Sequence, residues 1–347
     1  MKWNERMLLL IALLGLLYLA GCSSKNITSE PKEQVIKEEP EEISASYYPA
    51  PFTGEQLTEK LENRPILATV NNHPLARPQS GIADADLIYE FLAEGEVTRY
   101  LALFHSKIPD QIGPIRSARD YFVKLAEGMD VFYLAHGYSP DAKKLLDNRI
   151  VDHVNGMQYD GSLFERSPER KAPHNSYISS DHIAQAFEIT NASEKISKMP
   201  VFSFLNPEES DKIGDIASSI IVSYSKNSNF ISTYQYDEQT NRYYRSVNGI
   251  DTVDKLNERR VELANIIVME MDHRMVDQEG RLAIDLHSGG KALLFHEGIA
   301  KTIEWENMDG FLTPLEQGLP VKLTAGKTWV HIVPSLSGPT TSVTYTP

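Results

Sequence analysis

Arginine and histidine side chains recur in this sequence where apolar runs end. The run Ile66–Val70 is followed by Asn71, Asn72 and His73, and the run Val97–Phe104 is followed by the arginine-containing block 113–119. Guanidinium groups beside helix N-termini bind carboxylates and phosphates. The pattern therefore predicts an anion-binding site. The candidate ligand-binding residues that this region supplies are Arg116, Ser117, Arg119, His136, His174 and Asn175.

A second interpretation of the same region is acid/base catalysis. General acid/base chemistry needs only a positioned pair of groups with suitable pKa values. Here His73, His136 or His174 could form that pair with Glu90 or Glu94. Any single histidine is more often a structural or surface residue, so the signal lies in their grouping.

Ser117 could be a nucleophile, but a structural role explains it more simply. With Asp120 three residues further on, it predicts the N-terminal cap of an amphipathic helix. Other catalytic motifs are absent, since the sequence contains no glycine-rich phosphate loop, no His-Glu-x-x-His and no Gly-x-Ser-x-Gly.

Two carboxylate and imidazole pairs could suggest a metal. Asp285 and His287 would share one face of a strand, and Asp272 adjoins His273. A zinc site needs a third protein ligand, and the sequence does not place one. We expect surface roles for these residues, no metal and no cofactor.

The elements that would position the arginine and histidine cluster alternate between strand and helix. The expected strands are Ile66–Val70, Leu87–Ala93, Val97–Phe104, Val131–Ala135 and Ile150–Val154. The expected helices are 118–127, with Gly128 just beyond its end, and one that starts at Ser139-Pro140 and ends near Asn148. This alternation predicts an α/β N-terminal domain with a mostly parallel sheet, in which ligands gather at the carboxyl ends of the strands.

Glu94-Gly95 is expected to form a hairpin turn between the strands Leu87–Ala93 and Val97–Phe104. A two-residue turn there would place Glu90 opposite Arg99 on an apolar face. We expect an ion pair that is either structural or part of a site, and the structural role is favoured.

Beyond residue 215 the sequence changes to short strands separated by glycine and Asx turns. The expected strands include Ser219–Tyr224, Phe230–Tyr236, Asn265–Met271 and Thr328–Val333. Such spacing is typical of a curved antiparallel sheet, so we predict a smaller, mainly antiparallel β domain at the C-terminus. The predicted organisation is a signal peptide over 1–21, a disordered acidic tether over 22–50, an α/β domain over 51–198, a linker over 199–214 and a β-rich domain over 215–347.

The N-terminus carries the sequence of a secretory signal. Lys2 and Arg6 precede the apolar run Met7–Leu19, which at about 13 residues is too short for comfortable membrane spanning. The segment Leu19-Ala20-Gly21-Cys22 follows, and Cys22 is the only cysteine among 347 residues. The tetrapeptide resembles the bacterial lipobox, which implies cleavage after Gly21, a thioether-linked diacylglycerol on Cys22 and further acylation such as palmitate. Two or three acyl chains give stable anchoring.

The negative net charge of the chain argues against some classes of binding partner. The whole sequence has a net charge of −14, and the signal carries +1 from Lys2, Glu5 and Arg6, so the mature chain has −14 − 1 = −15. We therefore expect no nucleic-acid partner and no close contact with an anionic leaflet. An anion would need a local basic site.

Several blocks of the sequence together resemble the YerB-like lipoproteins of Gram-positive bacteria. They are Asn72-His73-Pro74, Ala76–Gly81, Ala85-Asp86 with Tyr89-Glu90, Glu94-Gly95 with Thr98-Arg99, Gly113–Arg119, Ala172–Asn175 and Gly326–Trp329. The resemblance covers essentially the whole mature chain and implies a two-domain envelope protein. The resemblance also implies that Arg77 and Arg99 join the candidate ligand-binding residues. The family has no assigned function, so the resemblance supplies no catalytic residues.

The sequence thus predicts a non-enzymatic lipoprotein on the extracytoplasmic face of the cell membrane. It would bind an anionic wall polymer or another envelope protein through its N-terminal domain. The alternative is a wall- or lipid-modifying hydrolase that uses histidine and carboxylate chemistry.

Overall fold

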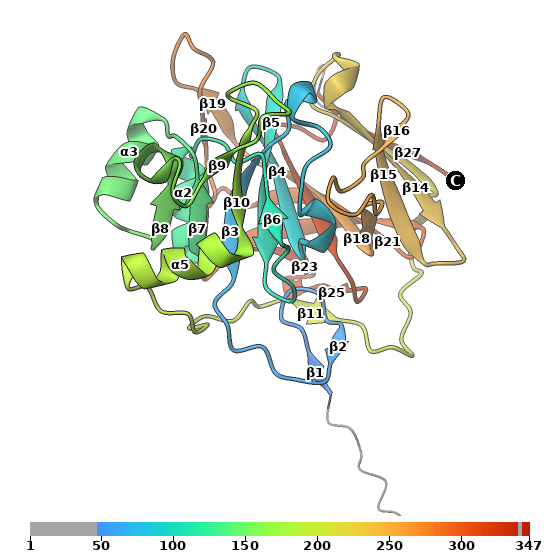
Figure 1. The fold of residues 1–347 in the computed structure, drawn as a ribbon. Helices are drawn as coiled ribbons and strands as arrows, with labels where there is room; N and C mark the ends of the chain where they lie inside the picture. The colour runs from blue at the N-terminus through green and yellow to red at the C-terminus, as the bar shows by residue number, and fades with distance from the viewer. Residues whose placement is uncertain (1–46, 339–341) are drawn as a thin grey trace, which may run out of the picture. The chain divides into compact units, whose positions relative to one another are not determined.

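A twelve-stranded mixed sheet dominates the computed structural model, which describes residues 47–338 and 342–347 (Figure 1). In spatial order its strands are β24 (Leu319–Pro320), β23 (Phe311–Glu316), β22 (Ile299–Met308), β21 (Gly290–His296), β18 (Asn265–Glu270), β26 (Thr328–Val333), β4 (Leu87–Glu94), β5 (Val97–Phe104), β3 (Ile66–Asn71), β7 (Phe132–Ala135) and β8 (His153–Asn155), with β12 (Asp215–Ile216) paired to β22. Cys22 and the predicted signal lie outside the described residues.

The predicted fold class is wrong, because the chain is mostly β and its N-terminal strands do not form a mostly parallel α/β sheet. β5 lies between β3 and β4 and runs antiparallel to both. On the other side of β4, β26 from near the C-terminus pairs with it in parallel. The sheet therefore joins strands from both halves of the chain, and β18 and β21–β24 continue it.

The described chain also forms a six-stranded antiparallel sheet, of which β14 and β15 are gold in Figure 1. Its strands are β16 (Ile250–Asp251), β15 (Arg242–Val247), β14 (Ile231–Asp237), β13 (Ser219–Ser223) and β27 (Ser342–Thr346), with β17 (Glu262–Leu263) paired to β15.

Short strand pairs and helices complete the described fold. The short sheets are β1 (Tyr48–Pro49) with β2 (Gln56–Leu57), β6 (Gln111–Ile112) with β10 (Ser176–Ser179) and β9 (Glu165–Arg166), β11 (Ser203–Phe204) with β25 (Lys322–Leu323), and β19 (His273–Met275) with β20 (Leu282–Ile284). The helices are α2 (Asp120–Gly128), α3 (Pro140–Asp147), α4 (Gly156–Tyr159) and α5 (Ser180–Thr190), with 3₁₀ turns η1 (Pro74–Ala76), η2 (Ile82–Asp84) and η3 (Ser228–Phe230).

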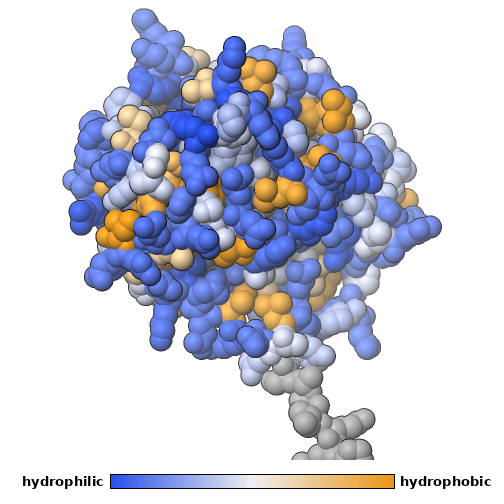
Figure 2. Space-filling view, viewed as in Figure 1, coloured by the Kyte–Doolittle hydropathy of each residue, from blue (hydrophilic) through white to orange (hydrophobic). Residues whose placement is uncertain are grey.

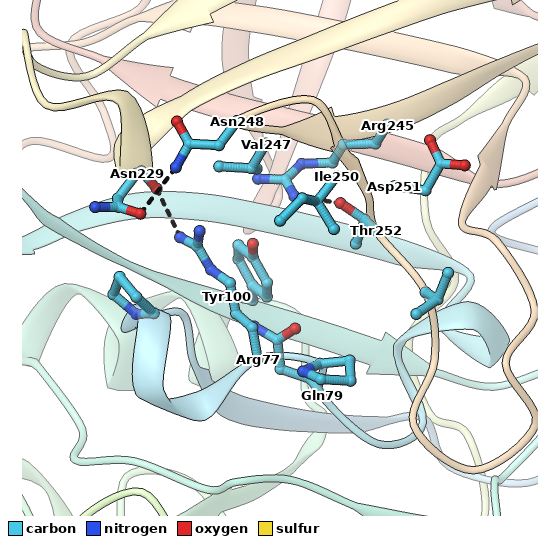
Figure 3. A pocket seen from close by; sticks show the side chains of 13 residues that line it. Arg77, Gln79, Tyr100, Asn229, Arg245, Val247, Asn248, Ile250, Asp251 and Thr252 are labelled. Atoms are coloured by element: carbon cyan, nitrogen blue, oxygen red, sulfur yellow. Dashed lines mark hydrogen bonds between the residues drawn. The ribbon is translucent and has the colours of Figure 1, made fainter.

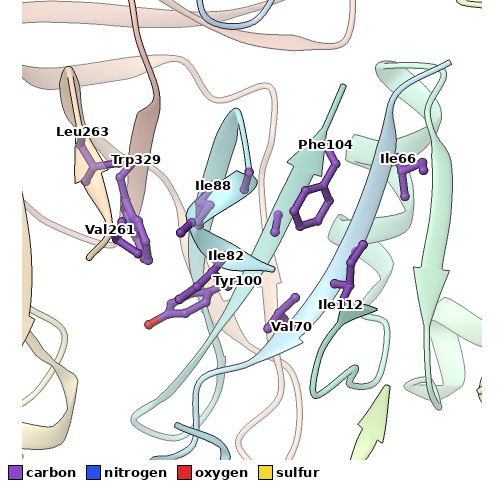
Figure 4. Packing of buried hydrophobic residues seen from close by; sticks show 14 of the residues in the cluster. Ile66, Val70, Ile82, Ile88, Tyr100, Phe104, Ile112, Val261, Leu263 and Trp329 are labelled. Carbon is purple, nitrogen blue, oxygen red and sulfur yellow. The ribbon is translucent and has the colours of Figure 1, made fainter. Parts of the chain in front are cut away.

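Strand β4 is buried on both of its faces. Ile88 belongs to one apolar cluster, which includes Trp329 and residues of the six-stranded sheet (Figure 4). Tyr89 and Phe91 belong to the other cluster, which includes the apolar face of α2. Because successive side chains of a strand point to opposite faces, burial on both sides explains why this strand is apolar along most of its length.

The two predicted helices differ in how well their starts were placed. The prediction for α3 is confirmed, because Ser139 accepts a hydrogen bond from the Ala142 amide and Pro140 occupies the first turn. Helix α2 begins at Asp120, later than predicted, and its N-cap is Arg119. The backbone at Ala118 is extended instead, because it pairs with the segment at Tyr138. Ser117 is therefore not a helix cap.

The visible surface is largely hydrophilic, with hydrophobic residues in small separate patches (Figure 2). Within the described part of the chain, no helix has the length and apolarity needed to span a membrane.

Candidate functional site

The register of the β4–β5 hairpin decides which charged groups meet. Glu90 lies opposite Tyr100, and Arg99 lies opposite Phe91. Since neighbouring positions of a strand point to opposite faces, Glu90 and Arg99 are on different faces of the sheet. The predicted ion pair between them is wrong, and each has another partner.

Arg99 and Arg119 share the carboxylate of Glu94. Both donate to Glu94 Oε1, Arg99 from β5 and Arg119 from the start of α2. Arg99 also donates through Nη1 to the carbonyl of Ser117 at 2.7 Å, and Arg119 donates through Nη1 to that of Ala118 at 2.9 Å. The two arginine side chains are only 3% and 7% exposed, whereas Glu94 is 41% exposed. Two nearly buried cations are thus fixed around one accessible anion.

The electrostatics of this group confirm an excess of positive charge. Burial and the neighbouring guanidinium groups of Arg119 and Arg116 lower the pKa of Arg99 to about 9, against the opposing effect of Glu94. Partial burial alone would raise the pKa of Glu94, but the Arg99, Arg119 and Arg116 guanidinium groups hold it below its ordinary value. Glu94 is therefore ionised at neutral pH, and its one negative charge does not balance the positive charges of Arg99, Arg116 and Arg119.

Arg116 is the unpaired member of the group. It is half-buried, and its guanidinium makes no hydrogen bond or ion pair with any residue in the described ranges 47–338 and 342–347. Burial lowers its pKa, Glu94 opposes that shift, and Arg119 adds to it. An anionic ligand could bind here without displacing an existing partner of Arg116.

These side chains line an open pocket of about 260 Å³, which we call the arginine pocket. Its lining residues are Glu94, Arg99, Arg116, Ser117, Arg119, Tyr138, Ser139, Glu279 and Arg281. Arg281 is already paired with Asp277 at 2.5 Å and with Glu279 at 3.3 Å. The lining thus holds two carboxylates, and of these it is Glu94 that contacts Arg99 and Arg119.

Ser117 lies in the arginine pocket, but its contacts do not support a nucleophile. Its hydroxyl donates to the carbonyl of His136 at 3.2 Å, which is a structural contact. Gly137 permits the close approach, because it has φ +95° and a Cβ there would lie 2.6 Å from Ser117 Oγ. The loop is thus packed tightly beneath the pocket.

The predicted histidines lie in two other groups. His73 and His174 stack with ring centroids 4.5 Å apart, and Asn71 contacts His174 Nδ1 at 2.9 Å. Burial lowers the pKa of both histidines, and Arg116 adds to this effect in each case. The described contacts of His73, His136 and His174 include neither Glu90 nor Glu94, so the structure does not assemble the acid/base pair of the alternative hypothesis.

His136 and Asn175 are joined through Arg166. Arg166 Nη2 donates to His136 Nε2 at 2.7 Å, and its Nη1 donates to Asn175 Oδ1 at 3.2 Å. Asp160 holds the same guanidinium at 3.0 Å. Burial, followed by the charge of Arg166, lowers the pKa of His136. This neutral imidazole is a hydrogen-bond acceptor that fixes the loop.

Arg77 and Glu90 belong to a different part of the molecule. Arg77 lines a separate cavity, whose other wall comes from the β15–β16 hairpin (Figure 3). Glu90 is 1% exposed and lies 3.5 Å from Arg245 Nη2. A carboxylate so deeply buried is a structural partner, not a group that meets a substrate.

Sequence reasoning missed the contribution of the C-terminal half, above all Arg245 and Arg281. The one local signal was Asn248-Gly249, a dipeptide typical of a tight hairpin that presents its flanking residues. No group of three histidine, cysteine, aspartate or glutamate residues suited to a metal occurs among the residues that the structure describes.

Comparisons with known proteins identify relatives along almost the whole described chain. Residues 52–193 match the N-terminal domain model, and residues 220–330 the C-terminal domain model, of a family described as protein of unknown function DUF3048. The putative lipoprotein YerB of Bacillus subtilis (strain 168) is 42% identical over 290 residues, which are 83% of this chain and 86% of that protein. The crystal structure of YerB from Bacillus subtilis superposes with a TM-score of 0.78 at 40% identity, covering 86% of this chain and 99% of that one.

Proposed function

The chain belongs to the DUF3048 family, as both of its domain models and the similarity to the putative lipoprotein YerB require, and on this premise we propose that it is a membrane-anchored lipoprotein that binds an anionic envelope ligand in the arginine pocket. The anchor would be a lipid on Cys22, as the lipobox resemblance implies. The folded body would then face the outside of the cell membrane.

The observation that carries the binding proposal is the charge imbalance of the arginine pocket. The lining carries four guanidinium groups, those of Arg99, Arg116, Arg119 and Arg281, and two carboxylates, those of Glu94 and Glu279, so its side-chain charges sum to 4 − 2 = +2. Arg116 makes no side-chain hydrogen bond or ion pair with another described residue. A protein gains nothing for stability by gathering like charges in a half-buried pocket, since their mutual repulsion adds to the cost of desolvation. Such an arrangement is typical of a site that is completed by an anion.

The geometry favours an oxyanion as the ligand. Arg99 and Arg119 are held rigidly by backbone carbonyls, while Arg116 keeps its donors available. Planar guanidinium groups recognise carboxylates and phosphates through paired hydrogen bonds. Wall-polymer phosphates and wall-peptide carboxylates are the envelope components with this chemistry. Because the chain as a whole has a net charge of −14, long-range attraction would not bring such polymers to it, and the local site must.

The test compares polymer binding by the full chain in detergent solution with binding by two variants. Arg116→Ala removes the unpaired guanidinium, and Lys322→Ala removes one positive charge from an exposed pair with Glu209 outside the pocket. We expect Arg116→Ala to weaken binding of purified teichoic acid or peptidoglycan fragments by about tenfold or more, the typical value of a charged hydrogen bond. Lys322→Ala should leave it unchanged. Equal binding by wild type and Arg116→Ala would overturn this site.

The two ligand chemistries are distinguished by the choice of polymer. Teichoic acid offers phosphates, and teichoic-acid-free peptidoglycan offers peptide carboxylates. Binding of one that depends on Arg116 assigns the ligand class. Binding of neither, at low ionic strength where surface charges are least screened, would refute the proposal.

A further inference from the structure

A second cavity, of about 360 Å³, lies between the η1 turn and the β15–β16 hairpin (Figure 3). We call it the hairpin cavity. It shares no lining residue with the arginine pocket. Its size lies within the range of about 300–1,000 Å³ that is usual for small-molecule sites. Its lining residues are Pro74, Arg77, Pro78, Gln79, Tyr100, Asn229, Arg245, Val247, Asn248, Ile250, Asp251, Thr252 and Val253.

One wall of the hairpin cavity is the tip of the β15–β16 hairpin, which contributes the apolar side chains of Val247 and Ile250. Asn248 and Gly249 have φ values of 54° and 71°, which are those of a tight two-residue turn, and Val247 pairs directly with Ile250. Ile250 is 73% exposed even though it is apolar. An apolar side chain held at the mouth of a cavity by a preorganised turn is suited to contact with the body of a ligand.

The floor and the opposite wall of the cavity carry two cations. Arg77 donates to the carbonyls of Asn229 at 2.7 Å and Asn72 at 2.9 Å, and to Asn72 Oδ1 at 3.0 Å. All these acceptors are neutral, and among the described residues Arg77 has no carboxylate within ion-pair distance. The second cation, Arg245, is 2% exposed and stacks over the ring of Trp329 at 4.5 Å.

The negative groups near the cavity do not balance these cations. Glu90 is the carboxylate paired with Arg245, at 3.5 Å. Asp251 lines the cavity, but it is already paired with Arg260 at 3.0 Å. Within the described chain, the Arg245 Nε atom is buried and has no hydrogen-bond partner. Two cations and one available carboxylate leave one positive charge in excess.

We propose that the hairpin cavity binds a small monoanionic carboxylate with an apolar or aromatic body. The carboxylate would accept hydrogen bonds from Arg77, and the body would lie against the ring of Tyr100 and the side chains of Val247 and Ile250. A single excess charge matches a carboxylate better than a dianionic phosphate. The mostly apolar lining with few convergent polar groups is what distinguishes a small-molecule site from a polymer-binding surface.

The experiment titrates the full chain, in detergent solution, with N-acetyl-L-phenylalanine and follows binding calorimetrically. The matched uncharged probe is N-acetyl-L-phenylalanine amide, and acetate supplies the charge without the body. We expect the carboxylate to bind at least about tenfold more tightly than either the amide or acetate, because each lacks one of the two required contacts. Equal binding of the amide would overturn the role of the cations. Tighter binding of phenyl phosphate would overturn the choice of a monoanion.

Variants at Ile250 locate the probe without disturbing the core. Ile250→Asp places a carboxylate at the mouth of the cavity, and Ile250→Asn is its uncharged match of the same size. We expect Ile250→Asp to weaken binding of N-acetyl-L-phenylalanine by about tenfold relative to Ile250→Asn, through repulsion at a partly screened distance. Indistinguishable binding by the two variants, both folded by circular dichroism, would place the probe elsewhere and overturn the proposal.

Discussion

Glu90→Gln should destabilise the fold strongly, because it removes the charge that balances a buried arginine. Glu90 accepts hydrogen bonds from Thr98 Oγ1 at 2.7 Å and from Trp329 Nε1 at 3.1 Å, and lies 3.5 Å from Arg245 Nη2. The substitution preserves the shape of the side chain. It leaves the guanidinium of Arg245, which is 2% exposed, without its carboxylate.

The size of the effect can be worked from this burial. Burial alone would lower the pKa of Arg245, but Tyr100 and Glu90 raise it above its ordinary value, so the group stays charged in the native state. Breaking one side of a buried ion pair costs about 3–5 kcal/mol. Ser46–Pro347 is one compact unit of 347 − 45 = 302 residues. At about 2.1 cal/mol/K per residue, its unfolding entropy is about 0.63 kcal/mol/K, so the melting temperature should fall by about 5–8 °C.

The assay is thermal unfolding of the full chain, followed by circular dichroism, for three variants beside wild type. Glu90→Gln should melt about 5–8 °C lower. The double variant Glu90→Gln/Arg245→Met should recover part of the loss, because no uncompensated charge remains in the core. Asp141→Asn, at the exposed pair with Lys144, is the control and should not change the melting temperature measurably.

A shift of less than about 1 °C for Glu90→Gln would refute this reasoning, since it would mean that Arg245 is compensated by other groups. A double variant no more stable than the single one would refute it as well. In either case Glu90 would have to be reconsidered as a functional group.

Four further predictions concern the anchor, the pocket and the core. Cys22→Ser should move the protein from the membrane to the soluble fraction and abolish labelling by a radioactive fatty acid, because the proposed attachment atom is lost. Glu94→Gln should raise the affinity of the arginine pocket for teichoic acid by about 3- to 10-fold in a binding titration, because it removes the carboxylate that is paired with Arg99 and Arg119 and competes with the ligand for them. Asp86 is almost completely buried, and burial raises its pKa to about 6, although the backbone amides of Ser106 and His105 donate hydrogen bonds to it and oppose the shift. The native state therefore binds the Asp86 proton more tightly than the unfolded state does. Consequently, the contribution of Asp86 to stability is lost as pH rises from about 4 to about 6. Denaturation by urea should show that Asp86→Asn lacks this decline. Gly137→Ala should lower stability by about 1–3 kcal/mol in the same assay, because alanine is strained at φ +95° and its Cβ would meet Ser117 Oγ.

Each of these predictions has a contrary outcome. Membrane retention of Cys22→Ser would mean that another segment anchors the chain. Weaker anion binding by Glu94→Gln, with the fold intact, would make Glu94 part of the ligand site instead of its competitor. Parallel pH profiles for wild type and Asp86→Asn would place the pKa of Asp86 near its ordinary value. Unchanged stability of Gly137→Ala would show that the loop beneath the pocket can move.

Much of the local structure could be predicted because it depends on neighbours in the sequence. The apolar run at Ile66–Val70 became β3, and Ser139-Pro140 starts α3 as expected. Glu94-Gly95 does join β4 and β5 as an antiparallel hairpin. The proximity of Arg116 and Arg119 could also be anticipated, because both lie just before one helix start, whereas Arg99 lies within β5 and joins them through the fold.

The prediction of the fold class was wrong because the local sequence pattern does not show which strands pair with each other. The apolar sequence of β4 shows that both faces are covered, but not which strand lies beside it. That neighbour is β26, more than 200 residues later, and its parallel pairing merges the two halves of the chain into one sheet. Backbone hydrogen bonds are the same for every sequence, so the choice of partner rests on packing across the whole core.

The register of the β4–β5 hairpin is a second feature that the local sequence could not predict. The hairpin has a register shift between Leu92 and Glu94, and its pairing places Glu90 on the opposite face from Arg99. A one-residue change in pairing moves every side chain to the other face of a sheet. Because of this register, Glu90 pairs with Arg245 in the core, whereas Arg99 pairs with Glu94 in the open pocket.

The amino-acid sequence alone predicts where this protein is anchored, from one cysteine in a lipobox-like tetrapeptide, and shows that its body is acidic with arginines grouped in a few blocks. Which of those arginines are compensated follows only from the folded arrangement. Arg245 and Arg281 have carboxylate partners, whereas Arg116 and Arg77 have none among the described residues. The physical reason is that ion pairing acts over a few ångströms, and those distances are set by strands that are remote in the sequence.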